Sequence, residues 1–167
     1  MAHELLNGLS PAEVDQVLAL GTPMTVPSGA SLFRLGDPAD CLYLTVRGRI
    51  RLTLPMLVRG KEEDILVDER LPGQMLGWSA LVPPYRFTLS ATAPLETEVI
   101  ALPREALCAF CEASPAVGSK IGLNLAIVVG NRLQLMQAMW LREMQHIVEL
   151  KSSQAGAARS DQPGRLL

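Results

Sequence analysis

The chain has 167 residues, of which 49% are hydrophobic and 19% charged, a balance that predicts one globular domain with a sizeable core. Fifteen basic and seventeen acidic residues give a net charge of -2, which excludes a global field attracting nucleic acid or an anionic membrane. The longest apolar stretch, 121–129, is shorter than the ~20 residues of a membrane span, and the N-terminus has no signal-like run. We therefore expect a cytoplasmic protein without a membrane partner.

The segment NGLSPAEVDQVLAL predicts a short amphipathic helix near the start of the chain. Ser10 is the predicted N-cap, Pro11 takes the first helical position, and Glu13 completes a capping box. Gly21 is expected to stop this helix. His3 precedes it, in a start that we expect to be disordered.

From Met24 to Leu102, short β-branched runs alternate with Gly, Pro and Asp, which is typical of an all-β sandwich or barrel. In CLYLTVRGRIRLTL the apolar residues recur with a period of two, so one face is predicted to be core and the other solvated. Gly48 falls on the core side, which predicts a bulge or a close backbone approach. The core face comprises Leu42, Leu44, Val46, Ile50, Leu52 and Leu54, and the solvated face Tyr43, Thr45, Arg47, Arg49, Arg51 and Thr53.

The rest of this region is predicted as strands joined by polar turns. PMLVRGKEED is interpreted as a hairpin connection, ILVDERL as the return strand and PGQ as a turn. RFTLSATA and TEVIALP are predicted to form a further strand pair, separated by Pro94. The arginine row 47, 49 and 51 is more typical of a solvated face, with a partner patch as the alternative.

After Pro103 the apolar period becomes helical. REALCAFCEAS predicts a short helix that ends before Pro115. Residues 117–150 predict a long helix of ~33 residues, or ~50 Å, more than a domain of this size covers. Its apolar positions recur at three- and four-residue steps, as in a coiled-coil seam, so we predict a homodimer through 117–150. These positions are Ile121, Leu125, Val129, Leu133, Met136, Trp140 and Ile147.

Three cysteines make an odd number, so no disulfide framework is expected. Cys108 and Cys111 form a CxxC pair on the short helix, without a nearby second pair to complete a tetrahedral metal site. Packed or free thiols are the favoured interpretation, a redox or metal role is the alternative, and no metal site is predicted.

The order of a helix, about eight short strands, a short helix and a long helix resembles the cyclic-nucleotide-binding domain of the catabolite activator protein and FNR superfamily. LLNGLSPAEVDQVLALG looks like the family's first helix, and VPSGASLFRLGDPADCLYLTVRGRIRL like its first hairpin. LPGQMLGWSALVPPYRFTLSATA stands where the family has its phosphate-binding cassette. The hairpin carries Gly29, Gly36, Asp37, Ala39, Tyr43 and Gly48 in the family's places.

This resemblance implies a mainly β fold with flanking helices, namely a double-stranded β-helix (jelly roll) followed by a long C-terminal helix. Residues 1–116 would form the β-roll with its flanking short helices, and 117–150 the dimerisation helix. Residues 151–167, rich in Ser, Ala, Gly and Gln, are predicted to be a flexible tail.

In family members that bind cyclic nucleotide, backbone N–H groups and an arginine hold the cyclic phosphate, and a glutamate accepts from the ribose hydroxyl. Here Gly77 keeps the glycine, but Trp78 replaces the glutamate, and an indole nitrogen can only donate. The loop is shorter, and Pro83-Pro84 stiffens it. The resemblance nevertheless predicts a ligand site with cyclic AMP or cyclic GMP as the possible ligand and no other cofactor. Its residues would be Gly77, Trp78, Ser79, Ala80, Arg86, Phe87 and Thr88.

Several of these residues have a second interpretation. Arg86 is a phosphate anchor or a loop arginine in water or paired with a carboxylate such as Glu98. Trp78 is a stacking platform for a base or the plug of a degenerate pocket. Ser79 contacts the ligand or caps a helix, and Phe87 and Thr88 stand where small residues are expected. His146 is interpreted as a surface or interface residue, with haem ligation as the alternative.

No nucleophile-base pair, carboxylate dyad or Walker-type phosphate loop is visible, so we do not expect an enzyme. Regulators of the resembled family usually continue into a winged helix-turn-helix, and no such sequence follows Leu150, so direct DNA binding is not expected. The leading prediction is a small-molecule-sensing regulatory module that signals through its long helix to an unidentified protein partner. The alternative is a degenerate, non-binding domain that acts as a dimeric protein-interaction scaffold.

Overall fold

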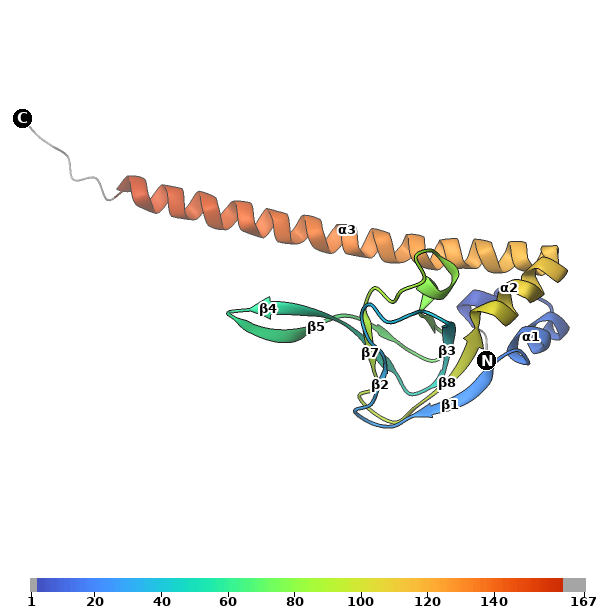
Figure 1. The fold of residues 1–167 in the computed structure, drawn as a ribbon. Helices are drawn as coiled ribbons and strands as arrows, with labels where there is room; N and C mark the ends of the chain where they lie inside the picture. The colour runs from blue at the N-terminus through green and yellow to red at the C-terminus, as the bar shows by residue number, and fades with distance from the viewer. Residues whose placement is uncertain (1–2, 161–167) are drawn as a thin grey trace, which may run out of the picture. The chain divides into compact units, whose positions relative to one another are not determined.

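The computed structural model describes residues 3–160, with side chains as far as residue 151 (Figure 1). The chain divides into two compact units, Met1–Val128 and Val129–Leu167, and we describe each by itself. The first unit begins with η1 (Glu4–Leu6) and α1 (Pro11–Leu18). Its strands are β1 (Thr22–Val26), β2 (Ser31–Phe33), β3 (Cys41–Arg47), β4 (Ile50–Val58), β5 (Lys61–Arg70), β6 (Met75–Leu76), β7 (Ser90–Thr92) and β8 (Thr97–Pro103). Its helices after β6 are η2 (Trp78–Leu81), α2 (Arg104–Ala113) and the start of α3 (Pro115–Ser160).

Two antiparallel four-stranded sheets form the β-roll, in the orders β1-β8-β3-β6 and β2-β7-β4-β5. This arrangement confirms the predicted mainly β jelly roll with flanking helices. The predicted pairing of RFTLSATA with TEVIALP is wrong, because β7 pairs with β2 and β4 whereas β8 pairs with β1 and β3. The connection that contains Pro94 carries the chain from one sheet to the other.

The N-terminal segment is ordered on the β-roll. The predicted capping box is confirmed, since Ser10 N donates to Glu13 Oε2 at 2.7 Å and Glu13 N to Ser10 Oγ at 3.4 Å. The expectation that His3 is disordered is wrong, because its side chain is buried. Next to it, Glu4 N donates to the Gly73 carbonyl and Glu4 Oε1 accepts from Met75 N, which fixes this segment to the β5–β6 turn.

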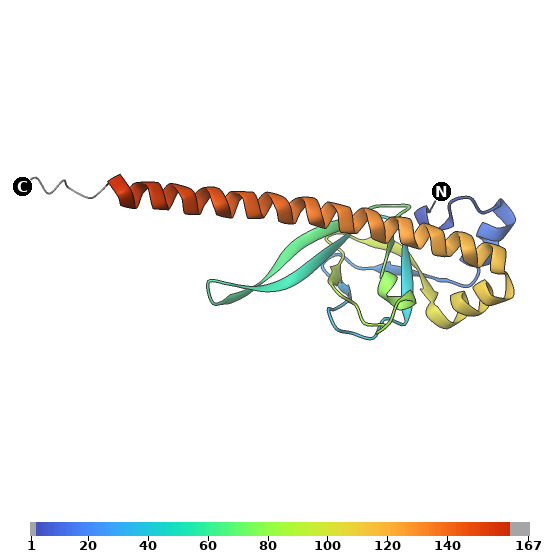
Figure 2. The same cartoon turned by 90° about the horizontal axis from the view of Figure 1, so that it is seen from above.

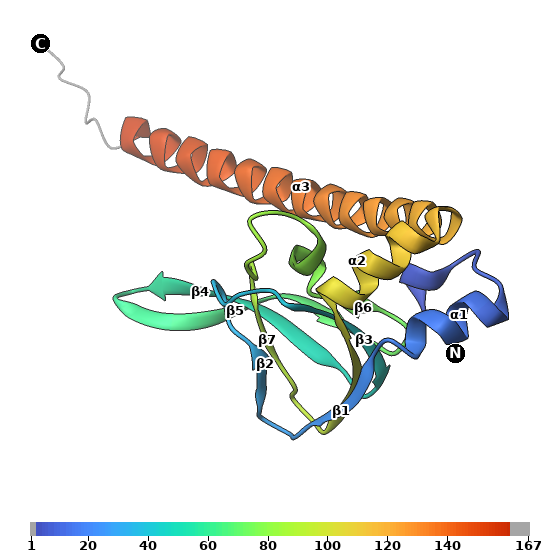
Figure 3. The ribbon, with the colours of Figure 1, turned by 45° about the vertical axis from the view of Figure 1, so that its right-hand side comes forward.

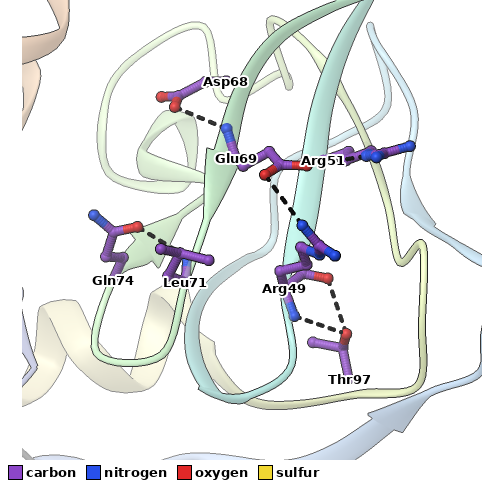
Figure 4. A network of polar contacts seen from close by, with 7 residues as sticks. All are labelled: Arg49, Arg51, Asp68, Glu69, Leu71, Gln74 and Thr97. Carbon is purple, nitrogen blue, oxygen red and sulfur yellow. Dashed lines mark hydrogen bonds and ion pairs between the residues drawn. The ribbon is translucent and has the colours of Figure 1, made fainter.

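The β3–β4 turn contains the predicted close backbone approach. Gly48 has φ +85°, and a Cβ there would lie 2.5 Å from Thr97 Oγ1. That hydroxyl accepts from Arg49 N at 3.1 Å and donates to the Arg49 carbonyl at 2.9 Å (Figure 4). The predicted alternation fails at Thr45 and Thr53, which are buried instead of solvated, because irregularities after Thr45 and before Thr53 shift the register.

The β4–β5 hairpin is longer than the sequence predicted. Residues interpreted as a connection continue both strands, and the turn lies at Arg59 and Gly60, with φ of +51° and +78°. Two consecutive positive φ values are the signature of a tight type I′ turn, whose twist matches that of the strands. The end of the hairpin extends beyond the other strands of the roll in both Figure 1 and Figure 2.

One hydrophobic core fills the roll and reaches under the helices. Its fully buried side chains include Leu42, Leu44, Met75, Leu76, Leu102 and Leu107. α2 lies next to β8, and the start of α3 follows it (Figure 3). Ile121 of α3 is buried in this core, so it is not available for the predicted intermolecular seam. The amide of Asn124 also donates to the Leu5 and Asn7 carbonyls at 2.9 and 2.8 Å.

The three cysteines are free thiols. Cys108 on α2 is exposed, whereas Cys111 is half-buried, and burial raises the pKa of its thiol. Burial likewise raises the pKa of Cys41. A raised pKa lowers the thiolate fraction at neutral pH and so favours the packed-thiol interpretation over a reactive one.

In the second unit, α3 continues as a helix to Ser160, ten residues beyond the predicted end. No proline interrupts it before Pro163, and alanines at 155, 157 and 158 favour the helical backbone. Residues 161–167 of the predicted tail lie outside the described part. Most large apolar side chains from Leu133 to Leu150 are exposed. Within the described residues, no helix is both long and apolar enough to cross a membrane.

Candidate ligand-binding site

The cassette predicted from the sequence begins where β6 ends. β6 pairs with β3 and delivers Gly77, whose φ of +77° is left-handed and starts η2. A Cβ at Gly77 would lie 3.1 Å from the Phe87 ring and 3.3 Å from the Cys41 carbonyl, so a side chain here would be both strained and crowded. Ser79 and Ala80 are buried below this turn, and Trp78 is half-buried against the core.

The segment that returns from the cassette alternates between the inside and the outside of the roll. Phe87 is 5% exposed, whereas Arg86 and Thr88 are exposed. Arg86 Nη1 donates to the Gly36 carbonyl at 2.8 Å. Glu98 pairs with Arg47 at 2.8 Å and is not the partner of Arg86. Of the predicted site residues, Gly77, Ser79, Ala80 and Phe87 are thus buried, Trp78 is half-buried, and Arg86 and Thr88 are exposed.

An aromatic cluster lies under the cassette. Phe87 stacks on Phe33 with ring centroids 3.7 Å apart and planes 10° apart, and Phe33 stacks on Tyr43 at 5.8 Å. Burial raises the pKa of Tyr43 to about 12. Sequence reasoning missed Phe33, although its position at the end of a short apolar strand was the available signal. A side chain at position 77 would meet the Phe87 ring at 3.1 Å and the Tyr43 ring at 3.4 Å, so this cluster lies directly against the cassette glycine.

The outer face of the β4–β5 hairpin is a network of paired charges (Figure 4). Glu69 accepts from Arg51 Nε at 3.0 Å and lies 3.6 Å from Arg49 Nη1. All three side chains are partly exposed, so each pair contributes at most about 1 kcal/mol. In the arginine row predicted for the solvated face, Arg49 and Arg51 thus pair with Glu69 on β5, whereas Arg47 pairs with Glu98 on β8.

The inner face of the same hairpin carries an ion pair that sequence reasoning missed. Arg70 is 6% exposed, and its Nη2 donates to Asp68 Oδ2. Asp68 Oδ1 also accepts from Glu69 N at 2.8 Å. The available signal was the spacing of two opposite charges at i and i+2 in a strand, which places both on one face. Within the described residues, no group of three His, Cys, Asp or Glu side chains could hold a metal ion.

Comparison with known proteins gives a consistent result. A family model for the cyclic nucleotide-binding domain matches residues 23–114. The chain is 33% identical over 130 residues to the cyclic AMP receptor protein of Thermus thermophilus, covering 78% of this chain and 57% of that protein. It is 31% identical over 134 residues to glutaminase 1 of Bradyrhizobium diazoefficiens, covering 80% of this chain and 21% of that protein.

A solved structure agrees with these sequence relatives. The catabolite activator protein of Thermus thermophilus has a TM-score of 0.68 at 30% identity, covering 89% of this chain and 63% of that one. The chain spans about half the length, or less, of the curated relatives described here. Several of the relatives are regulatory proteins that respond to cyclic AMP by name. The family match supports a cyclic nucleotide as a possible ligand. From its fold, its cassette and the family match, this chain belongs to the cyclic nucleotide-binding domain family and is similar to cyclic-AMP-receptor-type regulatory proteins.

Proposed function

We propose that this chain is a small-molecule-sensing regulatory module in which an anionic ligand binds inside the roll beneath the cassette and signals through α3 to a protein partner. The observation that carries the proposal is the family match over 23–114, which includes both the first hairpin and the cassette. Gly77 supports it further, because its left-handed turn starts η2 as the cassette requires. A cyclic nucleotide is the ligand class that the family favours.

Binding would require two local rearrangements. The Phe87 ring would leave its stack on Phe33, a contact of about 0.5–1.5 kcal/mol beyond the area that it buries. For Arg86 to take part, its guanidinium would exchange the Gly36 carbonyl for a charged ligand oxygen, and a charge-assisted bond is about twice as strong as a neutral one. Both changes are small enough for a ligand of ordinary affinity to drive.

Signalling adds a thermodynamic requirement. The ligand must prefer one arrangement of α3 over another, since equal affinity for two arrangements shifts nothing. The first turns of α3 are fixed to the roll by Val117 and Ile121 in the core and by Asn124 at the N-terminal segment. A conformational change in the roll would therefore be transmitted to the first turns of α3 through these contacts.

The Phe33–Phe87 stack favours a second candidate, a non-binding domain that acts as a dimeric scaffold. In this function the stacked rings replace the ligand as the filling of the roll, and Trp78 in place of the acidic residue has no sugar to contact. The exposed apolar side chains between Leu133 and Leu150 would carry the contacts to the other chain.

Titration calorimetry and thermal melting with cyclic AMP and cyclic GMP separate the two candidates. For a sensor, nucleotide raises the melting temperature of the parent by mass action. Phe87→Ala, which removes the stacked ring, would bind at least as tightly as the parent, and Arg47→Ala on the outer surface is the control. If the parent shows no heat and no shift at millimolar nucleotide, the sensing function is wrong and the scaffold is supported.

The signalling step needs its own measurement. Amide exchange along α3 would differ between the free and the nucleotide-bound parent if ligand binding changes this helix. Unchanged exchange in a protein that does bind nucleotide would contradict signalling through α3, while leaving ligand binding intact.

A further inference from the structure

We propose that Asp68 and Arg70, on the inner face of β5, form the polar recognition site for a small organic anion that also carries hydroxyl groups. This inference rests on the proposed sensing function and identifies the side chains that select its ligand. It moves recognition from the cassette, where Trp78 replaces the acidic residue and Arg86 is exposed and bonded to the Gly36 carbonyl, to the neighbouring strand.

The two faces of β5 differ at this end of the hairpin. Glu69 faces outward, where it meets Arg49 and Arg51 (Figure 4). Asp68 and Arg70 therefore face the other way, because side chains alternate along a strand. Their cross-strand partners agree with this assignment, since Asp68 is opposite Leu52 and Arg70 opposite Ile50, both of which are buried.

Arg70 has a hydrogen-bonding requirement that the described residues leave incomplete. Its side chain is more than nine-tenths buried, and its Nε has no hydrogen-bond partner among the described residues. A guanidinium has five N–H donors, and a buried donor without a partner destabilises the folded state. Buried polar atoms of this kind call for a further partner, which is a water molecule or a ligand.

A second buried polar group that has no partner in the described part of the chain lies on β3, whose backbone is bonded to the turn after Arg70. Thr45 is fully buried and its hydroxyl has no partner among the described residues. Its backbone bonds to Gln74 and Gly73, in the turn that follows Arg70 along the chain. A ligand with both donors and acceptors would fit Arg70 and Asp68, whereas a simple inorganic anion offers no donor to Asp68.

The pair is connected to the cassette by a short, fixed turn. Leu71 N donates to Gln74 Oε1 at 2.8 Å, and β6 starts directly after this turn and leads into Gly77. In Figure 4, Asp68 lies on the side of β5 away from Arg49 and Thr97. The ion pair and the cassette are thus neighbours in one continuous segment, 68–81.

The chemistry of the pair fits the proposed ligand class. A guanidinium binds phosphate or carboxylate oxygens through a planar fork, and the Nε edge is one side of that fork. An ionised aspartate only accepts, so it selects hydroxyl or amine donors. Because Arg70 is paired with Asp68, the guanidinium is not an isolated buried charge, and a ligand would add a charge-assisted bond at its Nε edge.

The experiment compares Arg70→Lys with Arg51→Lys in the full chain. Lysine keeps the positive charge beside Asp68 but lacks Nε and the planar fork of the guanidinium. The substitution should therefore remove the proposed ligand contact while disturbing the fold as little as possible. Calorimetry with cyclic AMP should show affinity at least about tenfold weaker for Arg70→Lys, the loss expected for a charge-assisted bond. Arg51→Lys, on the outer face of the same hairpin, should bind as the parent does.

A second measurement does not depend on the stability of any variant. The Nε–H resonance of Arg70 in the parent, assigned by its absence in Arg70→Lys, should move when cyclic AMP is added. Asp68→Asn should weaken binding of both cyclic AMP and adenosine, whereas Arg70→Lys should weaken only cyclic AMP, because adenosine lacks the phosphate.

The outcomes separate this inference from the proposed function. If the parent binds cyclic AMP, the Arg70 resonance stays fixed and Arg86→Ala abolishes binding, the inference is wrong and the sensing function stands. If the parent binds neither cyclic AMP nor cyclic GMP, the sensing function and the inference both fail. A water molecule as the only partner of Nε would give an unmoved resonance and equal affinities for both lysine variants, which also overturns the inference.

Discussion

Apolar side chains are buried in the β-roll but exposed in the distal half of α3. In the roll, Leu42, Leu44 and Leu102 are fully buried by other parts of the same chain. In α3 beyond Val129, Leu133, Met136 and Trp140 are 56%, 57% and 62% exposed. The roll thus has a core of its own, whereas the distal helix leaves its large apolar side chains exposed, as the proposed dimer requires. A membrane is not needed to explain this surface, because hydrophilic side chains interrupt it throughout.

The largest expected difference between the two regions comes from matched leucine truncations. Leu44→Ala leaves a cavity in a fully enclosed position and should lower the free energy of unfolding by about 2–5 kcal/mol. Leu133→Ala removes an exposed side chain and should change the unfolding of the roll by less than about 0.5 kcal/mol. Urea denaturation of both variants, followed by a signal from the roll, measures this difference.

Leu133→Ala should have its effect on association. Sedimentation at several protein concentrations should show a dimer for the parent and weaker self-association for Leu133→Ala, with Leu44→Ala tested only where it remains folded. Equal destabilisation of the roll by both substitutions would show that Leu133 packs within the same chain, and the contrast between the regions would then be wrong.

Two glycines sharpen the contrast at the level of the backbone. Gly48→Ala in the roll combines φ of +85° with a Cβ only 2.9 Å from the Glu96 carbonyl oxygen, and should cost about 3 kcal/mol. Gly130→Ala in α3 meets no atom within 4 Å and should stabilise the helix by up to about 1 kcal/mol, because alanine is the better helix former. Thermal melting should show a lower melting temperature than the parent for Gly48→Ala and a higher one for Gly130→Ala.

The control for Gly48 is Gly60→Ala at the hairpin turn, where φ is also positive but the space around the Cβ is open. Gly60→Ala should lower the free energy of unfolding by about 1–2 kcal/mol, the penalty of a positive φ for alanine without any steric clash. If Gly130→Ala weakens self-association, a second helix approaches closely at that position, and the distal helix is more tightly packed in the dimer than its exposure indicates.

Most of the fold could be predicted because its signals are local. The capping box at Ser10, the close approach at Gly48 and the helix after Pro103 each depend on a few neighbouring residues, and all three are present in the structure. The pairing of β7 and β8 was predicted wrongly, since two strands joined by a short connection usually pair and only the crossing between sheets separates them. The buried Thr45 was missed because an irregularity of register leaves no mark on a period-two pattern.

Less of the candidate site was predictable. The cassette glycine follows from the family's pattern, but the buried Phe87 stands where that pattern has a small residue, and the exposure of Arg86 depends on a register that the shortened loop leaves open. Asp68 and Arg70 lie in a run of charges, DER, that looks like a solvated strand when read alone. Only the burial of Ile50 and Leu52 on the facing strand shows which face of β5 is interior.

The smallest expected effect concerns the aromatic cluster under the cassette and its response to alkaline pH. Burial raises the pKa of Tyr43 to about 12, above the value near 10 of an unfolded tyrosine. Between about pH 10 and 12 the unfolded chain therefore releases this proton and the folded chain keeps it, so the stability that the neutral phenol contributes is complete below pH 10 and is lost as pH rises. Tyr43→Phe should make the melting temperature fall less steeply over this interval, and Tyr85→Phe, at an exposed tyrosine, serves as the control because other groups titrate in the same range. Parallel curves for the parent and Tyr43→Phe would show that water reaches the phenol, and hence that the cluster of Phe33, Tyr43 and Phe87 opens in solution and is not part of the rigid core that distinguishes the roll from the helix.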